Sequence, residues 1–131
     1  MVIVILLVLA LFVLQTFLPG RFRETPPPGG PSKLSLDLGP RDHMPPLTVV
    51  GGRATRALAN MQEALPVFLA LALMNMIVAP NAATAITGAW IFLAARVIYV
   101  LLYLTGVPVA RTIVWFAGWV GLAMMIPPLL R

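Results

Sequence analysis

The chain has 131 residues, of which 60% are hydrophobic, and it carries a formal net charge of +5 at pH 7. Only 10% of the residues are charged, against about 25% in an average soluble domain. This composition excludes a soluble globular domain, a disordered tail and a collagen-like repeat, and it predicts one integral membrane domain.

Three residue counts restrict the chemistry further. The chain has no cysteine, one histidine and four carboxylates. We therefore expect no disulfide framework, no thiolate nucleophile and no metal site. Nine basic residues are spread through an apolar chain, a distribution that favours topology signals and site residues over nucleic-acid binding.

The first expected helix covers about residues 1–18, which are almost wholly apolar apart from Gln15 and Thr16. It has neither a basic start nor a small-residue cleavage site, so we expect a helix that is not removed as a signal peptide. Pro19-Gly20 is expected to end it. Residues 20–47 are rich in proline and glycine, which predicts a long loop without regular structure that serves as a linker or a lid.

Three more helices are expected over about residues 48–78, 83–104 and 109–130, with turns at Pro80-Asn81 and at 105–108. Each is long enough to cross a bilayer, for which about 20 apolar residues suffice. The sequence therefore predicts an all-α fold: a four-helix integral membrane domain over residues 1–131.

The basic residues predict the orientation of these spans. The long loop contains three arginines and one lysine, and Arg111 follows the last turn. By the positive-inside rule we expect both connections to face the cytoplasm and both termini to lie outside, in the inner membrane if the cell is bacterial. Arg131 is the one basic residue that argues against this orientation.

A polar stripe crosses the first half of the segment 48–78. At 100° per residue, Arg53, Arg56, Asn60 and Glu63 fall within an arc of about 80°. The stripe descends from the membrane interface towards the bilayer core.

A second polar stripe lies on the segment 83–104. Arg96, Tyr99 and Tyr103 fall within an arc of about 60°. This helix runs back towards the cytoplasmic side, so Arg96 is the deepest of the three, and Arg111 opens the next helix. The two stripes and Arg111 are therefore expected to converge in the cytoplasmic half of the membrane.

Glu63 and Arg96 are the two charges expected deepest in the membrane. A charged side chain at the centre of a membrane helix costs about 2.5–3.5 kcal/mol on insertion scales. We therefore expect the two to pair, within or between subunits. One interpretation is a purely structural ion pair.

A second interpretation is a binding site for an anion, because four arginines surround one carboxylate. Its alternative is that Arg53, Arg56 and Arg111 extend to lipid phosphates, which is the preferred interpretation for Arg53. Tyr99 and Tyr103 are interpreted either as part of the site or as an interfacial aromatic belt. The three tryptophans are interpreted as packing or belt residues.

These motifs resemble a known family, the membrane-associated proteins of eicosanoid and glutathione metabolism (MAPEG). The run Arg53-Ala-Thr-Arg56-Ala-Leu-Ala-Asn60-Met-Gln-Glu63-Ala-Leu-Pro66 is similar to the family's second-helix signature R-x-x-R-A-x-x-N-x-x-E-x-x-P. The third-helix pattern of arginine, aromatic and tyrosine, and an arginine after a glycine-containing turn, are matched by Arg96, Tyr99, Tyr103 and Arg111. The resemblance covers about residues 35–131.

The resemblance implies four-helix bundles that assemble as homotrimers, with a site between neighbouring subunits near the cytoplasmic face. It implies glutathione as co-substrate and no metal, with Glu63 receiving the α-amino group and Arg111 stabilising the thiolate. The residues that the resemblance assigns to glutathione binding are Arg53, Arg56, Asn60, Glu63, Arg96, Tyr99 and Tyr103.

Three functions are compared. The first is a glutathione-dependent transferase or peroxidase that acts on lipophilic electrophiles reaching the site from the bilayer. The second is a non-catalytic member of the family that binds lipid or a partner. The third, a small multidrug-type transporter, is disfavoured because such proteins carry their glutamate in the first helix, without surrounding arginines.

Overall fold

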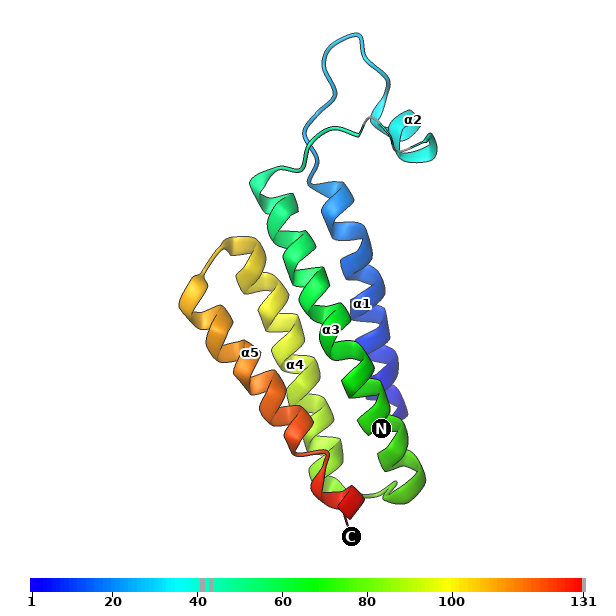
Figure 1. Cartoon of the computed structure of the whole chain (residues 1–131), viewed down its shortest axis with the longest axis vertical. Helices are drawn as coiled ribbons and strands as arrows, with labels where there is room; N and C mark the ends of the chain where they lie inside the picture. Colours follow the sequence, from blue (N-terminus) through cyan, green and yellow to red (C-terminus); the bar gives the residue numbers. More distant parts are fainter. Residues whose placement is uncertain (41, 43, 131) are drawn as a thin grey trace.

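The computed structural model describes residues 1–40, 42 and 44–130, and its four long helices lie side by side (Figure 1). The order across the bundle in this view is α5, α4, α3 and α1, and the short α2 lies beyond the end of α1. We call the end where α1 stops, α3 starts and α4 turns into α5 the loop end. The elements are α1 (Val2–Arg21), α2 (Lys33–Leu38), α3 (Val49–Val78), α4 (Ala83–Thr105), α5 (Pro108–Ala123) and the 3-10 helix η2 (Pro127–Leu130).

Four segments are long and apolar enough to cross a membrane: Val2–Arg21, Val49–Val78, Ala83–Thr105 and Pro108–Leu130. The predicted all-α, four-helix membrane fold is therefore confirmed. The 30 residues of α3 correspond to a length of about 45 Å, against a hydrocarbon core of about 30 Å. One or both ends of α3 therefore extend past the hydrocarbon.

Local signals explain where the long helices begin and end. The Thr48 hydroxyl accepts a hydrogen bond from the Gly51 amide at 3.2 Å and so caps the start of α3. Gly106 ends α4 in the left-handed conformation, with φ of 84°. Pro108 opens α5, where its missing N–H is harmless.

The first helix is longer than the sequence suggested. α1 passes through Pro19 and ends at Arg21. Because the proline lies in the last turn, its fixed φ fits the helix and only one backbone hydrogen bond is lost.

The first connection contains a short helix, α2, whereas the sequence predicts a loop without regular structure over residues 20–47. The six-residue α2 forms because 33–38 contains neither proline nor glycine. The Ser32 hydroxyl caps its start by accepting from the Ser35 amide at 3.2 Å. Of the predicted loop residues, Arg41 and His43 lie outside the described part of the chain.

The core is made of stacked rings and close backbone contacts. Phe68 of α3 and Phe92 of α4 stack with ring centroids 4.7 Å apart, and both are fully buried. One turn earlier on α4 is Gly88, and a Cβ atom placed on Gly121 of α5 would lie 2.7 Å from the Gly88 carbonyl oxygen. The backbones of α4 and α5 therefore touch, which fixes where α5 presents its side chains.

Candidate functional site

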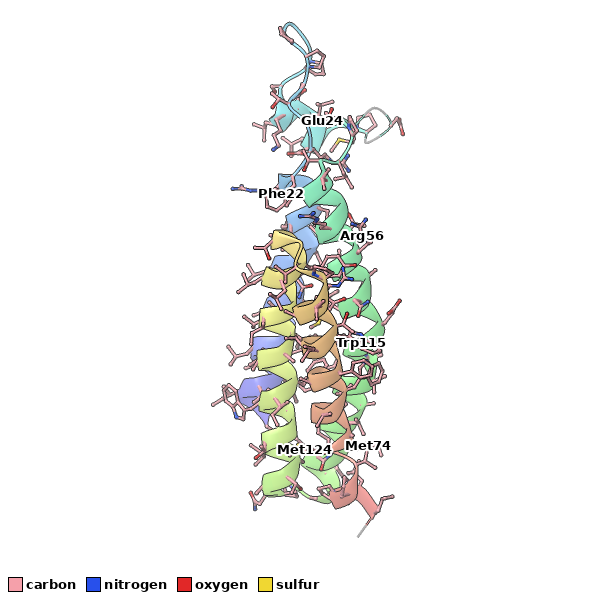
Figure 2. The ribbon with its side chains drawn as sticks, turned by 90° about the vertical axis from the view of Figure 1, so that its left-hand side faces the viewer. Phe22, Glu24, Arg56, Met74, Trp115 and Met124 are labelled. Atoms are coloured by element: carbon pink, nitrogen blue, oxygen red, sulfur yellow. The ribbon has the colours of Figure 1, made fainter. Side chains whose placement is uncertain are left out.

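A polar pocket of about 250 Å³ opens among α3, α4 and α5. Asn60 comes from α3, and the helical turns of α4 and α5 supply the rest of its lining: Tyr99, Tyr103, Arg111, Thr112 and Trp115. Three segments far apart in the sequence thus contribute side chains to one site. Figure 2 shows two of the side chains in this region: Trp115 lies part-way along the bundle, and Arg56 lies nearer the loop end.

The helical period brings these residues together. Tyr99 and Tyr103 are four residues apart on α4, as are Arg111 and Trp115 on α5, so each pair shares one helix face. One turn further along α5, Gly118 lies against Ala95 and Arg96 of α4, since a Cβ placed on it would be 3.7 Å from the Ala95 Cβ and 3.8 Å from the Arg96 Nε. The two faces therefore meet across a narrow gap.

A second, larger pocket of about 700 Å³ lies at the opposite end of the bundle, between the α3–α4 turn and the C-terminal prolines. None of the described residues that line it is charged: Val78, Ala79, Pro80, Asn81, Ala82, Ala83, Thr84, Pro127 and Pro128. Among the described lining residues of the two pockets, ionisable side chains occur in the smaller one: Tyr99, Tyr103 and Arg111.

Two guanidinium groups converge on one ring of the site. The Arg111 Cζ lies 4.6 Å from the centroid of the Tyr103 ring, and the Arg56 Cζ lies 6.0 Å from the same centroid. An aromatic face attracts a cation, but it does not cancel its charge. The positive charge that gathers around Tyr103 therefore favours an anionic ligand.

Arg96 is enclosed in the protein. Only 2% of its surface is exposed, and its guanidinium lies 5.0 Å from the Phe92 ring and 5.8 Å from the Tyr99 ring. None of its three nitrogens has a hydrogen-bond partner among the residues that the structure describes. The described part of one chain therefore contains no direct Glu63–Arg96 hydrogen bond.

Glu63 and Arg56 both lie exposed on α3 in the single chain. A carboxylate at membrane depth needs a partner or a water-filled cavity, because hydrocarbon solvates it poorly. The exposed position of Glu63 thus leaves it accessible to a group from outside the chain.

Arg53 is not among the residues that line the pocket. Its Nη1 donates a hydrogen bond to the Leu104 carbonyl oxygen at 3.2 Å. A Cβ on Gly106 would lie 2.6 Å from the Arg53 Cζ, so the guanidinium covers that glycine. It occupies the C-terminal end of α4, where free carbonyls favour a cation.

Trp115 and Thr112 also line the pocket, although the sequence pattern indicates only packing or an interfacial belt for the tryptophans. The Trp115 Nε1–H donates to the Asn60 Oδ1 at 3.0 Å, and the Thr112 hydroxyl donates to the Pro108 carbonyl at 3.3 Å. The four-residue spacing from Arg111 to Trp115 is the sequence signal that places Trp115 on the pocket face. Only the packing of α5 on α4 showed which face that is.

The described residues contain no group of three or more histidine, cysteine, aspartate or glutamate side chains placed to hold a metal ion. The pocket instead offers amide, hydroxyl, indole and guanidinium groups. These groups suit the binding of an organic anion by hydrogen bonds and charge.

Comparison with known proteins agrees with the fold. The family model of the MAPEG family matches residues 1–129, nearly the whole chain. In the same comparisons, no curated protein and no solved structure matches the chain. The four apolar spans and this match together show that the chain is a multi-pass integral membrane protein and belongs to the MAPEG family.

Proposed function

We propose that the chain is a membrane-bound enzyme that uses glutathione to conjugate or reduce lipophilic electrophiles. The observation that carries this proposal is the pocket among α3, α4 and α5, where Arg56 and Arg111 converge on Tyr103 and none of the described lining residues is a carboxylate. A site with this excess of positive charge is complementary to a peptide-like anion.

Glutathione matches the charges of this region. It has two carboxylates and one ammonium group, and guanidinium groups bind carboxylates through paired, charge-assisted hydrogen bonds. In the proposed complex Arg56 and Asn60 bind a carboxylate, the exposed Glu63 binds the ammonium, and the tyrosine hydroxyls add hydrogen bonds. Arg96, buried against Tyr99, adds positive potential from inside the bundle.

Arg111 supplies the chemistry at sulfur. A free thiol has a pKa of about 8.5 and reacts as the thiolate. Arg111 lies in the first turn of α5, so its guanidinium and the positive end of the helix both stabilise a nearby thiolate. No protein nucleophile is required.

The two reactions start from the same thiolate. In conjugation, the sulfur forms a bond to the electrophilic carbon. In a substitution the electron pair of the broken bond leaves with the departing group, and in an addition the pair of the broken π bond stays on the substrate and takes up a proton. In peroxide reduction, the thiolate attacks one oxygen and the O–O bond breaks. With the proton that the thiol had released, this gives an alcohol and a sulfenic acid, and a second glutathione converts the sulfenic acid to disulfide and water.

We further propose a homotrimer with its site completed between copies, and a cytoplasmic loop end. The exposed Glu63 supports the first part, because a neighbouring copy would shield it from lipid. The basic residues near the loop end support the second part. Exposed apolar residues of α5, Ile113 and Phe116, offer a lipophilic electrophile an entry from the bilayer.

Calorimetry of glutathione binding to the purified protein in lipid nanodiscs tests the proposal, with the ultraviolet absorbance of the thiolate recorded on the same sample. We expect saturable binding and thiolate at neutral pH, both reduced in Arg111→Ala. Arg21→Ala is the matched control, because it removes an exposed arginine at the end of α1.

A folded oligomer that binds no glutathione at millimolar concentration would overturn the proposal and favour the second candidate, a non-catalytic family member that binds lipid or a partner. Binding without thiolate formation would overturn the catalytic part alone.

A further inference from the structure

A single hydrogen bond joins α5 to α3 inside the pocket. The Trp115 Nε1–H donates to the Asn60 Oδ1 at 3.0 Å, and both side chains line the pocket. An indole N–H donates and never accepts, so the amide atom that faces it is the oxygen and not the nitrogen. The contact thus defines which way the Asn60 amide is turned.

We propose that Trp115 is a positioning residue that holds the Asn60 amide with its NH₂ group free for the ligand. The inference rests on the proposed glutathione function and deepens it. Because Trp115 occupies the oxygen, Asn60 offers the ligand mainly hydrogen-bond donors. It therefore holds an acceptor of glutathione, a carboxylate or peptide carbonyl, and leaves the ammonium to Glu63.

Trp115 is itself held firmly enough to do this. Its ring makes edge contacts with Phe116 and Trp119, with centroids 4.9 and 5.8 Å away. The Trp115 side chain also packs against the buried cluster formed by Ala57, Tyr99 and Tyr103. An indole fixed by packing orients its hydrogen-bond partner at little entropic cost.

The test is a double-mutant cycle on glutathione affinity, measured by calorimetry. Trp115→Phe removes the N–H and keeps a ring, and Asn60→Ala removes the amide. We expect Trp115→Phe to weaken binding about fivefold to tenfold, as the loss of one hydrogen bond does, but to have no further effect in the Asn60→Ala background. Trp90→Phe, which changes an exposed tryptophan of α4 outside the pocket, is the control and should bind as the unmodified chain does.

A second variant separates orientation from packing. Asn60→Asp keeps an oxygen for Trp115 but has no NH₂ group. We expect it to lose glutathione binding while the ¹⁵N–¹H resonance of the Trp115 indole stays close to its original position. The chain has three tryptophans, so this resonance is identified as the one that remains in both Trp90→Phe and Trp119→Phe. In Asn60→Ala the same resonance should shift. This pair of results holds even if Trp115→Phe fails to fold.

The outcomes distinguish this inference from the function on which it rests. If the unmodified chain binds no glutathione, the proposed function fails, and the role of Trp115 in holding glutathione fails with it. If the chain binds glutathione but Trp115→Phe has the same effect in both backgrounds, or Asn60→Asp binds normally, only the positioning role is overturned.

Discussion

A guanidinium inside a bilayer is stable only when other groups replace the water that it has lost. In this chain aromatic rings do so: Arg96 lies 5.0 Å from the Phe92 ring, and Arg111 lies 4.6 Å from the Tyr103 ring. An aromatic face compensates a cation only in part. At the residue scale, this incomplete compensation is the reason that the pocket should bind an anion.

We expect Arg111→Ala to lower the turnover rate at saturating glutathione about tenfold. The variant should raise the pKa of the bound thiol by about one unit, which corresponds to about 1.4 kcal/mol. The physical reason is the loss of a cation that stabilises the thiolate. The rate should partly recover as pH rises, because bulk hydroxide then removes the proton. Steady-state kinetics against pH with a lipophilic electrophile measure both effects. An unchanged rate would remove Arg111 from the mechanism.

At the scale of elements, close backbone contact between α4 and α5 positions the pocket walls. Gly88 and Gly121 face each other, and Gly118 packs near Ala95 and Arg96. At Gly88 and Gly121 the missing side chains let the two backbones touch, whereas Gly118 would have room for a Cβ. The distance across the pocket therefore depends on residues that do not line it.

Substitution of Gly121 by alanine tests this dependence. The new Cβ would lie 2.7 Å from the Gly88 carbonyl oxygen and 2.8 Å from the Phe92 nitrogen, so the helices must separate. We expect a loss of about 1–3 kcal/mol of stability, the range for overpacked cores, seen as a lower melting temperature in detergent. Gly20→Ala is the control, because its Cβ would meet nothing within 4 Å. Equal melting temperatures for the two variants would contradict the close packing.

A second element-scale prediction concerns the end of α4. Arg53→Ala removes the hydrogen bond to the Leu104 carbonyl, and we expect a loss of about 1 kcal/mol of stability, typical of one hydrogen bond. Glutathione affinity should fall less in Arg53→Ala than in Arg56→Ala, because the Arg56 guanidinium, unlike that of Arg53, lies near the Tyr103 ring of the pocket. Thermal unfolding and calorimetry of the two variants measure this. A larger loss of affinity in Arg53→Ala would return Arg53 to the binding site.

At the scale of the whole molecule, the single chain leaves a polar face on α3. Glu63 and Arg56 are exposed there, although the helix is apolar enough to cross a membrane. An exposed carboxylate is unfavourable against lipid, whereas a neighbouring copy or a bound ligand provides compensating charge. This exposed pair of charges is the observation on which the proposed assembly of copies rests.

We expect native mass spectrometry of the protein released from nanodiscs to give three times the mass of the chain. Glu63→Gln should weaken glutathione binding about tenfold or more, because a hydrogen bond to a charged group contributes roughly 1.5–3 kcal/mol. Gln62→Ala, on the neighbouring exposed position of α3, is the control for binding. A monomer in lipid that binds glutathione as tightly as the purified assembly would contradict a site between copies.

Hydropathy and helical period determine much of this protein without any structure. The four spans follow from apolar runs of sufficient length, because the bilayer requires continuous helices. The shared face of Tyr99 and Tyr103 follows from their spacing alone. The close packing of α4 and α5 is a tertiary feature, and no local pattern indicated that Gly88 and Gly121 touch.

Tertiary structure decided what each polar side chain meets. Arg53 and Arg56 share one stripe in the sequence, yet one covers the end of α4 and the other lies near Tyr103. Trp115 joins the pocket only because α5 packs on α4 with that face turned towards Asn60. Helical period fixes angles within one helix, whereas the rotation and separation of neighbouring helices depend on side-chain packing across the whole bundle.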